Sequence, residues 1–308
     1  MEYGLTRKVL GPKAFVPISK DEYESISQSH SGSLELLFLE EKYDLIVENY
    51  FEFETSLLEI VSRDMIRRDQ SYHTFNLERG LVDRRIANLL MSTKVYVDHA
   101  KQHVHRILEN IDEVACDADS ILSKQYDTRF GYRCMEALRN HVQHRGFPAH
   151  LIRWEHKWIE RENGKLMMNA ISPYVQPERL REDGEFKKAV LKEMEEYGEN
   201  IDLKELIRDY IEGLSIAHSE IRQCLRQCAD DWDNTLKKSI QRYTVEDPEK
   251  SNIGLCAVKK SESDEYSDWI HILPDILEQR KYFENKNKSL VNLSKRFITS
   301  EIVGNKKT

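Results

Sequence analysis

The sequence predicts a mainly helical protein that contains one β-hairpin. Of its 308 residues, 32% are charged and 40% are hydrophobic, a balance typical of helix-rich proteins with solvated charged faces. Apolar residues recur at helical spacing in several long stretches, and one Asn-Gly pair lies between two apolar runs. We therefore expect a helical bundle with a β-hairpin insertion and a small mixed segment at the C-terminal end.

The N-terminal third is predicted to hold an irregular arm and then a long helix. Residues 1–33 form the arm, because a Gly-Pro pair, a further proline and a run rich in Ser, His and Gly interrupt any regular pattern. At Ser33, a good N-cap, a helical pattern begins and continues to Ile60. This helix is either continuous or broken near Tyr43.

Two further helices are predicted before the hairpin. The first covers about residues 76–111 and carries a continuous apolar stripe, so it needs a partner to cover that stripe. The second covers about residues 127–142. Gly146 and Pro148 end it, in the order expected at a helix C-terminus.

The hairpin is predicted at about residues 150–174, where an Asn-Gly turn separates two apolar runs. Helical spacing returns over residues 178–197 and 202–243. After that, short apolar runs indicate one or two strands and a short helix. We expect residues 34–247 to form one helical domain containing the hairpin, and residues 248–308 to form a C-terminal α+β segment.

Composition excludes several classes of protein. No stretch approaches the roughly 18 apolar residues of a membrane span, and the start of the chain does not resemble a signal peptide, so we expect a cytoplasmic protein without a membrane partner. No phosphate-cradling Gly-rich loop or nucleophile elbow is present, which argues against ATPases and hydrolases of those classes. The cysteines lack metal or redox spacing and are interpreted as reduced thiols: Cys116, Cys134, Cys224, Cys228 and Cys256.

Charge is distributed unevenly along the chain. The net charge of -8 argues against a protein coated for nonspecific nucleic-acid binding, so any RNA contact must be local. One stretch is locally basic, and its alternative interpretation is ordinary helix-surface charge. Its basic residues are Lys124, Arg129, Arg133, Arg139, Arg145, Arg153, Lys157 and Arg161, against Asp127, Glu136, Glu155 and Glu160.

A motif lies within this basic stretch, at the end of the predicted helix. Arg139 is followed directly by Asn140 and, five positions after the arginine, by His144. An Arg, a polar residue, three more residues and a His near a helix end resemble the active-site motif of HEPN-type ribonucleases. The resemblance covers about residues 76–218. The alternative is that His144 and Arg145 only complement the helix dipole.

The resemblance implies RNA cleavage that needs neither a metal nor another cofactor, in which the ribose 2'-hydroxyl attacks the neighbouring phosphorus. His144 suits the proton transfer because imidazole titrates near neutral pH. Arg139 suits the phosphate because its guanidinium matches the oxygens that gather charge. Asn140 would orient Arg139, His144 or the substrate by hydrogen bonding. Arg145, His141 and Arg133 are the expected RNA-binding residues.

The resemblance also implies partners. Positions five apart on a regular helix are separated by about 140°, so Arg139 and His144 of one chain point in different directions. HEPN proteins typically dimerise so that two motifs meet, and we expect a homodimer here. The family is common in phage defence and toxin–antitoxin systems, so an antitoxin or another defence-system protein is an expected partner. Some HEPN toxins carry a modified Tyr where this chain has Gly146, which makes silencing by that route doubtful. The alternative function is a noncatalytic HEPN-like scaffold or regulatory protein.

Other constellations have simpler interpretations. His99 and His103 are four apart and could bind a metal, but no third ligand is placed by the sequence, so a polar helix face is preferred. His218 lies among apolar residues and is expected to be satisfied by a hydrogen bond in the core. Trp154 and Trp158 could stack on bases, although packing of the hairpin is the more common use of such residues.

Overall fold

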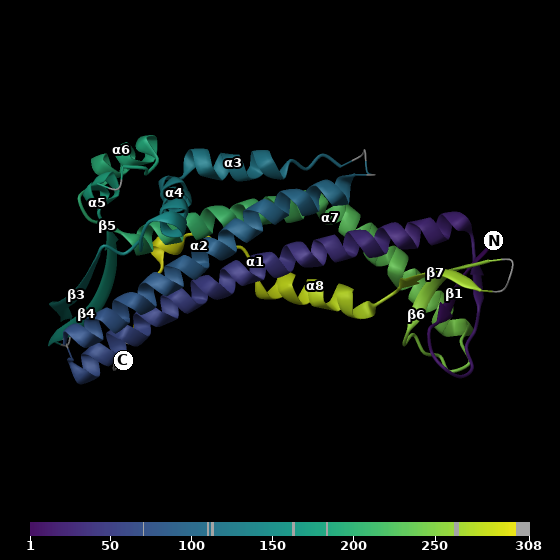
Figure 1. Cartoon of the computed structure of the whole chain (residues 1–308). Helices are drawn as coiled ribbons and strands as arrows, with labels where there is room; N and C mark the ends of the chain where they lie inside the picture. Colours follow the sequence, from purple (N-terminus) through teal and green to yellow (C-terminus); the bar gives the residue numbers. More distant parts are fainter. Residues whose placement is uncertain are drawn as a thin grey trace. The chain divides into compact units, whose positions relative to one another are not determined.

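The computed structural model shows a mainly helical chain with two small antiparallel sheets, as the sequence predicts (Figure 1). It describes residues 1–69, 71–109, 111, 114–161, 164–182, 184–261 and 265–299.

The chain divides into two compact units, each built from three separate segments. Unit 1 comprises Met1–Phe51, Met91–Leu122 and His218–Lys288. Unit 2 comprises Glu52–Leu90, Ser123–Ala217 and Ser289–Thr308. This division differs from the predicted domains, because segments that are far apart in the sequence fold together.

Three long helices, α1, α2 and α7, contribute residues to both units. The helices are α1 (Lys20–Arg67), α2 (Tyr72–Leu108), α3 (Ala118–Thr128), α4 (Phe130–His144), α5 (Pro177–Glu182), α6 (Lys188–Tyr197), α7 (Leu203–Glu246), α8 (Pro274–Lys286) and the 3-10 turn η1 (Leu293–Lys295). The helix predicted over 127–142 corresponds to α4, except that residues 127 and 128 end α3, and the helix predicted over 178–197 is divided into α5 and α6.

The prediction of an irregular arm over residues 1–33 was wrong. Helix α1 begins at Lys20 rather than at Ser33, and it runs past Tyr43 without a break. A capping box sets its start, because the Glu22 N–H donates to Ser19 Oγ (3.1 Å) and the Ser19 N–H donates to the Glu22 carboxylate (2.7 Å). Ser33 is buried inside the helix, more than three turns after its start.

The rest of the predicted arm belongs to a four-stranded sheet in unit 1. Strands β1 (Glu2–Arg7) and β2 (Val16–Ile18) pair with each other, and β1 also pairs with β6 (Leu255–Lys260), which pairs with β7 (Tyr266–His271). The order is β2-β1-β6-β7. The predicted C-terminal α+β segment is therefore confirmed in content, but its strands share a sheet with the N-terminal strands.

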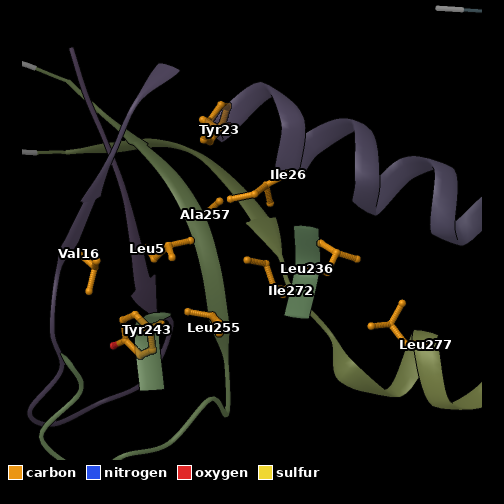
Figure 2. Close-up of a cluster of buried hydrophobic side chains, with 10 residues drawn as sticks. All are labelled: Leu5, Val16, Tyr23, Ile26, Leu236, Tyr243, Leu255, Ala257, Ile272 and Leu277. Carbon is orange, nitrogen blue, oxygen red and sulfur yellow. The ribbon is translucent and has the colours of Figure 1, made fainter. Parts of the chain in front are cut away.

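Buried side chains join this sheet to the helices of unit 1. Figure 2 shows ten of them, gathered between the strands, the N-terminal part of α1, the C-terminal part of α7, and α8. They are Leu5, Val16, Tyr23, Ile26, Leu236, Tyr243, Leu255, Ala257, Ile272 and Leu277. Burial of this apolar surface stabilises the sheet, because a small sheet with one open face is not stable alone.

A polar group lies deep in the helical part of unit 1. His218 is fully buried and contacts the Tyr96 hydroxyl (3.0 Å) and Glu40 (3.3 Å), and Arg222 also pairs with Glu40. The prediction that His218 is satisfied inside the core is confirmed. Hydrogen bonds from Arg222 and His218 hold the pKa of Glu40 at about 2 despite the opposing effect of burial.

The predicted hairpin is confirmed in unit 2. It consists of β3 (Leu151–Arg161) and β4 (Gly164–Val175), and the short strand β5 (Ile201–Asp202) pairs with β4, giving the order β3-β4-β5. Residues 162 and 163 of the predicted turn lie outside the described residues. Gly164 has φ +118°, a backbone conformation that favours glycine.

Candidate functional site

Helix α4 carries the Arg139–His144 motif, and α7 holds its first turn in place. Asp209 on α7 accepts hydrogen bonds from the Gly131 N–H (2.8 Å) and from Arg129 (2.7 Å). Arg129 separates α3 from α4 and has an extended backbone conformation. One face of α4 is fully buried, including Cys134, Met135 and Leu138. The helix that ends at His144 is therefore fixed by packing within unit 2.

The guanidinium of Arg139 is held by two neighbours on its own helix. Its Nη1 pairs with the Glu136 carboxylate (2.9 Å), and its Nη2 donates to Asn140 Oδ1 (3.0 Å). The side chain of Arg139 is only 11% exposed, and its buried Nε has no hydrogen-bond partner among the described residues. Glu136 also accepts a hydrogen bond from the Tyr210 hydroxyl (2.6 Å). Arg139 is thus preset in position, and its buried Nε–H is one of the donors that these contacts with described residues leave unused.

His144 is the last residue of α4 and is exposed. Within the described part of the chain, its side chain makes no hydrogen bond or ion pair. The helix ends directly after His144. There the carbonyl of His141 accepts hydrogen bonds from the backbone N–H groups of Arg145 (2.8 Å) and Gly146 (3.3 Å). The Arg145 side chain pairs with Glu185. His144 is the motif residue that a substrate can reach most directly.

A second imidazole lies close to this helix end. The rings of His141 and His150 have centroids 6.3 Å apart and are perpendicular. The Gln176 N–H donates to His150 Nδ1 (3.0 Å), so the proton of the neutral ring is on Nε2. Burial, together with His141 and Arg179, lowers the pKa of His150 to about 4. His150 is therefore neutral at pH 7 and presents an N–H donor.

Arg133, the third expected RNA-binding residue, has several protein partners. Its guanidinium pairs with Glu193 (2.8 Å) and donates to the carbonyls of Tyr126 (3.0 Å) and Asp127 (2.9 Å). These contacts join α4 to the end of α3 and to α6. The expected role of Arg133 in RNA binding remains a prediction.

The structure brings Arg139 and Asn140 into contact but leaves His144 apart from them. No hydrogen bond or ion pair among the described residues joins His144 to Arg139. This agrees with the rotation of about 140° between positions five apart on a helix. One copy of the motif therefore presents the imidazole and the guanidinium separately.

Sequence reasoning missed three residues of this region: Glu136, Tyr210 and His150. Glu136 could have been found, because residues three apart on a helix are neighbours and a Glu–Arg pair at this spacing is favourable. Tyr210 and the Gln176 N–H that orients His150 come from α7 and the end of β4, which no local pattern connects to α4.

The alternative His99–His103 metal site gains no third ligand. His103 Nδ1 contacts Glu35 (2.5 Å), and the rings of the two histidines are 6.1 Å apart. Among the residues that the structure describes, no group of three or more His, Cys, Asp or Glu side chains could hold a metal ion. Nor is any helix in those ranges long and apolar enough to cross a bilayer.

Comparison with protein-family models, with curated proteins and with solved structures finds no match to this chain.

Proposed function

We propose that this protein is a metal-independent endoribonuclease with a HEPN-like helical bundle and that Arg139, Asn140 and His144 form its active site. The observation that supports it best is the arrangement on α4, where an exposed imidazole ends the helix that holds a preset guanidinium. The proposal rests on this geometry and on the resemblance of the motif.

The proposed reaction uses His144 for proton transfer. Its imidazole takes the proton of the ribose 2'-hydroxyl, and the 2'-oxygen attacks the adjacent phosphorus. The bond from phosphorus to the 5'-oxygen breaks, and that oxygen takes up the proton that the His144 imidazolium gives back. The products are a 2',3'-cyclic phosphate and a 5'-hydroxyl. Arg139 stabilises the charge that develops on the phosphoryl oxygens, and Asn140 keeps its guanidinium oriented.

We further propose that the active form is a symmetric homodimer. Since His144 and Arg139 of one chain do not contact each other, a second copy of α4 can bring another motif to the same phosphodiester. Sedimentation at micromolar concentration should show a dimer, with or without RNA. A monomer under both conditions would contradict the composite site.

The biological setting we propose is the cytoplasm, in phage defence or a toxin–antitoxin system, with an antitoxin or another defence-system protein as a partner. This part rests on the resemblance alone. Coexpression with the products of neighbouring genes, followed by growth assays, would test it.

Cleavage of RNA by the purified protein is the direct test. We expect single-stranded RNA to be cut in the presence of EDTA, with cyclic phosphate at the new 3' ends. His144→Ala and Arg139→Ala should each reduce the rate by at least about 100-fold, the usual scale for loss of a proton-transfer group or of an oxyanion donor.

The matched control is His105→Ala, which removes an exposed histidine from α2 and should leave cleavage unchanged. Circular dichroism should show the same helix content in all variants. Equal cleavage by the His144→Ala protein would exclude the proposed mechanism.

One observation favours a different function, a noncatalytic HEPN-like scaffold or regulator. Both terminal nitrogens of the Arg139 guanidinium already have partners, and little of the side chain is exposed. In a scaffold, Arg139→Ala would lower stability by removing the ion pair of Glu136 and leaving it only the Tyr210 hydrogen bond, and no variant would affect RNA cleavage because none would occur.

A further inference from the structure

One long edge of the hairpin is open in unit 2. β3 is an edge strand, because the sheet has the order β3-β4-β5. Near its start Ile152 is buried, but from Glu155 onward nearly every residue of β3 is exposed. At an edge strand, side chains from both faces border the same free edge. Residues of both faces of β3 can therefore contact one extended ligand.

The two tryptophans of β3 have different surroundings. Trp154 is half-buried and packs against Phe75, with ring centroids 5.4 Å apart. Trp158 is 61% exposed, and Met167, its neighbour across the hairpin, is also exposed. Trp154 thus anchors the hairpin, whereas the indole of Trp158 offers a flat apolar surface to solvent. Nucleic-acid bases stack on such surfaces.

The chain leading to this edge is basic. Residues 137–154 contain no Asp or Glu, in a protein whose net charge is -8. Lys157 continues the series on β3, on the same face as Arg153 and about 13 Å further along the strand. Arg139 and Arg145 are paired with Glu136 and Glu185, so Arg153 and Lys157 are the cations of this series that would attract a phosphate backbone locally. The cationic and titratable residues of the segment are Arg139, Arg145, Arg153, His141, His144 and His150.

The start of β3 is tied to the end of α4. The backbone N–H of His150 donates to the Tyr174 carbonyl on β4 (2.9 Å). The His150 ring lies beside that of His141 on α4. The guanidinium of Arg153 lies over the Tyr174 ring (5.1 Å), which restrains it at the base of the hairpin. A strand bound along β3 would therefore lead to the helix end that carries His144.

We propose that the free edge of β3 from Arg153 to Trp158 is a docking strip for single-stranded RNA that leads to the end of α4. Arg153 and Lys157 bind phosphates, and Trp158 stacks on a base. The proposal rests on the proposed function, because it names the form of the substrate and its path. Stacking on Trp158 requires a base that is not already paired and stacked in a duplex.

The same edge is poorly suited to a partner β-strand. Its residues include Arg153, Glu155, Lys157 and Glu160, and charged side chains on an edge strand oppose pairing with another chain. Alternation of cationic side chains with an exposed indole matches a nucleic-acid strand better.

Fluorescence anisotropy with labelled oligouridine tests the strip. All proteins carry His144→Ala, so that binding is measured without cleavage. Trp158→Ala should weaken binding about 10-fold, and Trp158→Phe should restore most of the loss because it keeps a stacking ring. Lys157→Gln should weaken binding and reduce the slope of log affinity against log salt by about 0.7, the contribution of one phosphate contact on a single strand.

Phe297→Ala and Lys192→Gln serve as matched controls, because both residues are exposed in unit 2 and lie outside the hairpin. Neither should change RNA affinity. Unchanged affinity in both Trp158→Ala and Lys157→Gln would overturn the proposal. So would a change from dimer to monomer in Trp158→Ala with RNA affinity retained, which would make the strip a contact between copies of this chain.

The outcome is separable from that of the proposed nuclease. If the natural protein does not cleave RNA but Trp158→Ala weakens RNA binding, the strip stands and the catalytic proposal fails. If RNA is cleaved but the strip variants bind it normally, only the strip is excluded.

Discussion

At the scale of single residues, Asp83 on α2 links the fold to the candidate site. Its carboxylate is almost fully buried and accepts a hydrogen bond from the Ala149 N–H (3.1 Å), in the loop between α4 and β3. Burial raises the pKa of Asp83 to about 6, against the opposing effects of that hydrogen bond and of Arg79. Asp83 therefore restrains the loop after His144 through this hydrogen bond. When its carboxyl group is ionised, its burial lowers the free energy of unfolding.

We therefore expect Asp83→Asn to change how the free energy of unfolding depends on pH. In the folded protein the carboxyl binds its proton more tightly than in the unfolded chain, so its ionisation lowers stability as pH rises from about 4 to 6. Between pH 4.5 and 7.5 the natural protein should lose about 2 kcal/mol of unfolding free energy through this group, a loss absent from the variant.

Urea unfolding of both proteins over this pH range measures the difference. Other titrating groups occur in both proteins and cancel in the comparison. His150, for example, has a lowered pKa and loses stability in the opposite direction, as pH falls from about 6.5 towards 4. Parallel pH profiles for the two proteins would show that Asp83 does not titrate as we predict.

At the scale of elements, the start of α4 depends on a close approach to α7. A Cβ atom at Gly131 would lie 2.6 Å from the Leu206 carbonyl oxygen and 2.7 Å from the Asp209 side chain. Because one of these atoms belongs to the backbone, relief would require α4 to move. The glycine thus determines how closely the motif helix packs on α7.

We expect Gly131→Ala to lower the unfolding free energy by about 1–3 kcal/mol, the usual cost of overpacking. It should also reduce any RNA cleavage, because α4 carries the motif. Gly80→Ala is the matched control: among the described residues, an added Cβ at Gly80 in α2 would have nothing within 4 Å apart from the nearby backbone of its own helix, and alanine there should stabilise the helix by about 0.5–1 kcal/mol. Thermal unfolding followed by circular dichroism checks both. Equal effects of the two substitutions would contradict the packing argument.

At the scale of the whole molecule, strands from the two ends of the sequence form one sheet. Leu5 on β1 is opposite Ala257 on β6 and belongs to the buried cluster of Figure 2. The N-terminal strands therefore cover apolar surface that the C-terminal strands would otherwise expose. Unit 1 therefore needs the N-terminal strands as well as β6 and β7 to complete its sheet and core.

Leu5→Ala should accordingly lower the unfolding free energy by about 2–5 kcal/mol, through lost burial and the cavity left behind. Leu10→Ala, at a fully exposed position nearby, should leave stability unchanged. Chemical denaturation of the two variants makes the comparison. A small effect of Leu5→Ala would mean that β1 contributes little to the core of unit 1.

The sequence by itself determined the parts that depend on neighbouring residues. The helical spacing of apolar residues, the Asn-Gly turn and the helix stop before Gly146 indicated the helices, the hairpin and the end of α4. It also singled out Arg139, Asn140 and His144 as candidate site residues, because the motif is a local pattern on one helix.

Only the tertiary structure decided which distant segments meet. It paired β1 with β6, and it formed strands and the start of α1 where the sequence predicted an irregular arm. It also ended α3 at Thr128, just before α4, whose first turn is held by Asp209. It also brought Tyr210 of α7 to Glu136, the ion-pair partner of Arg139. These outcomes depend on contacts between residues far apart in the chain, and local periodicity carries no information about which partner each segment will find.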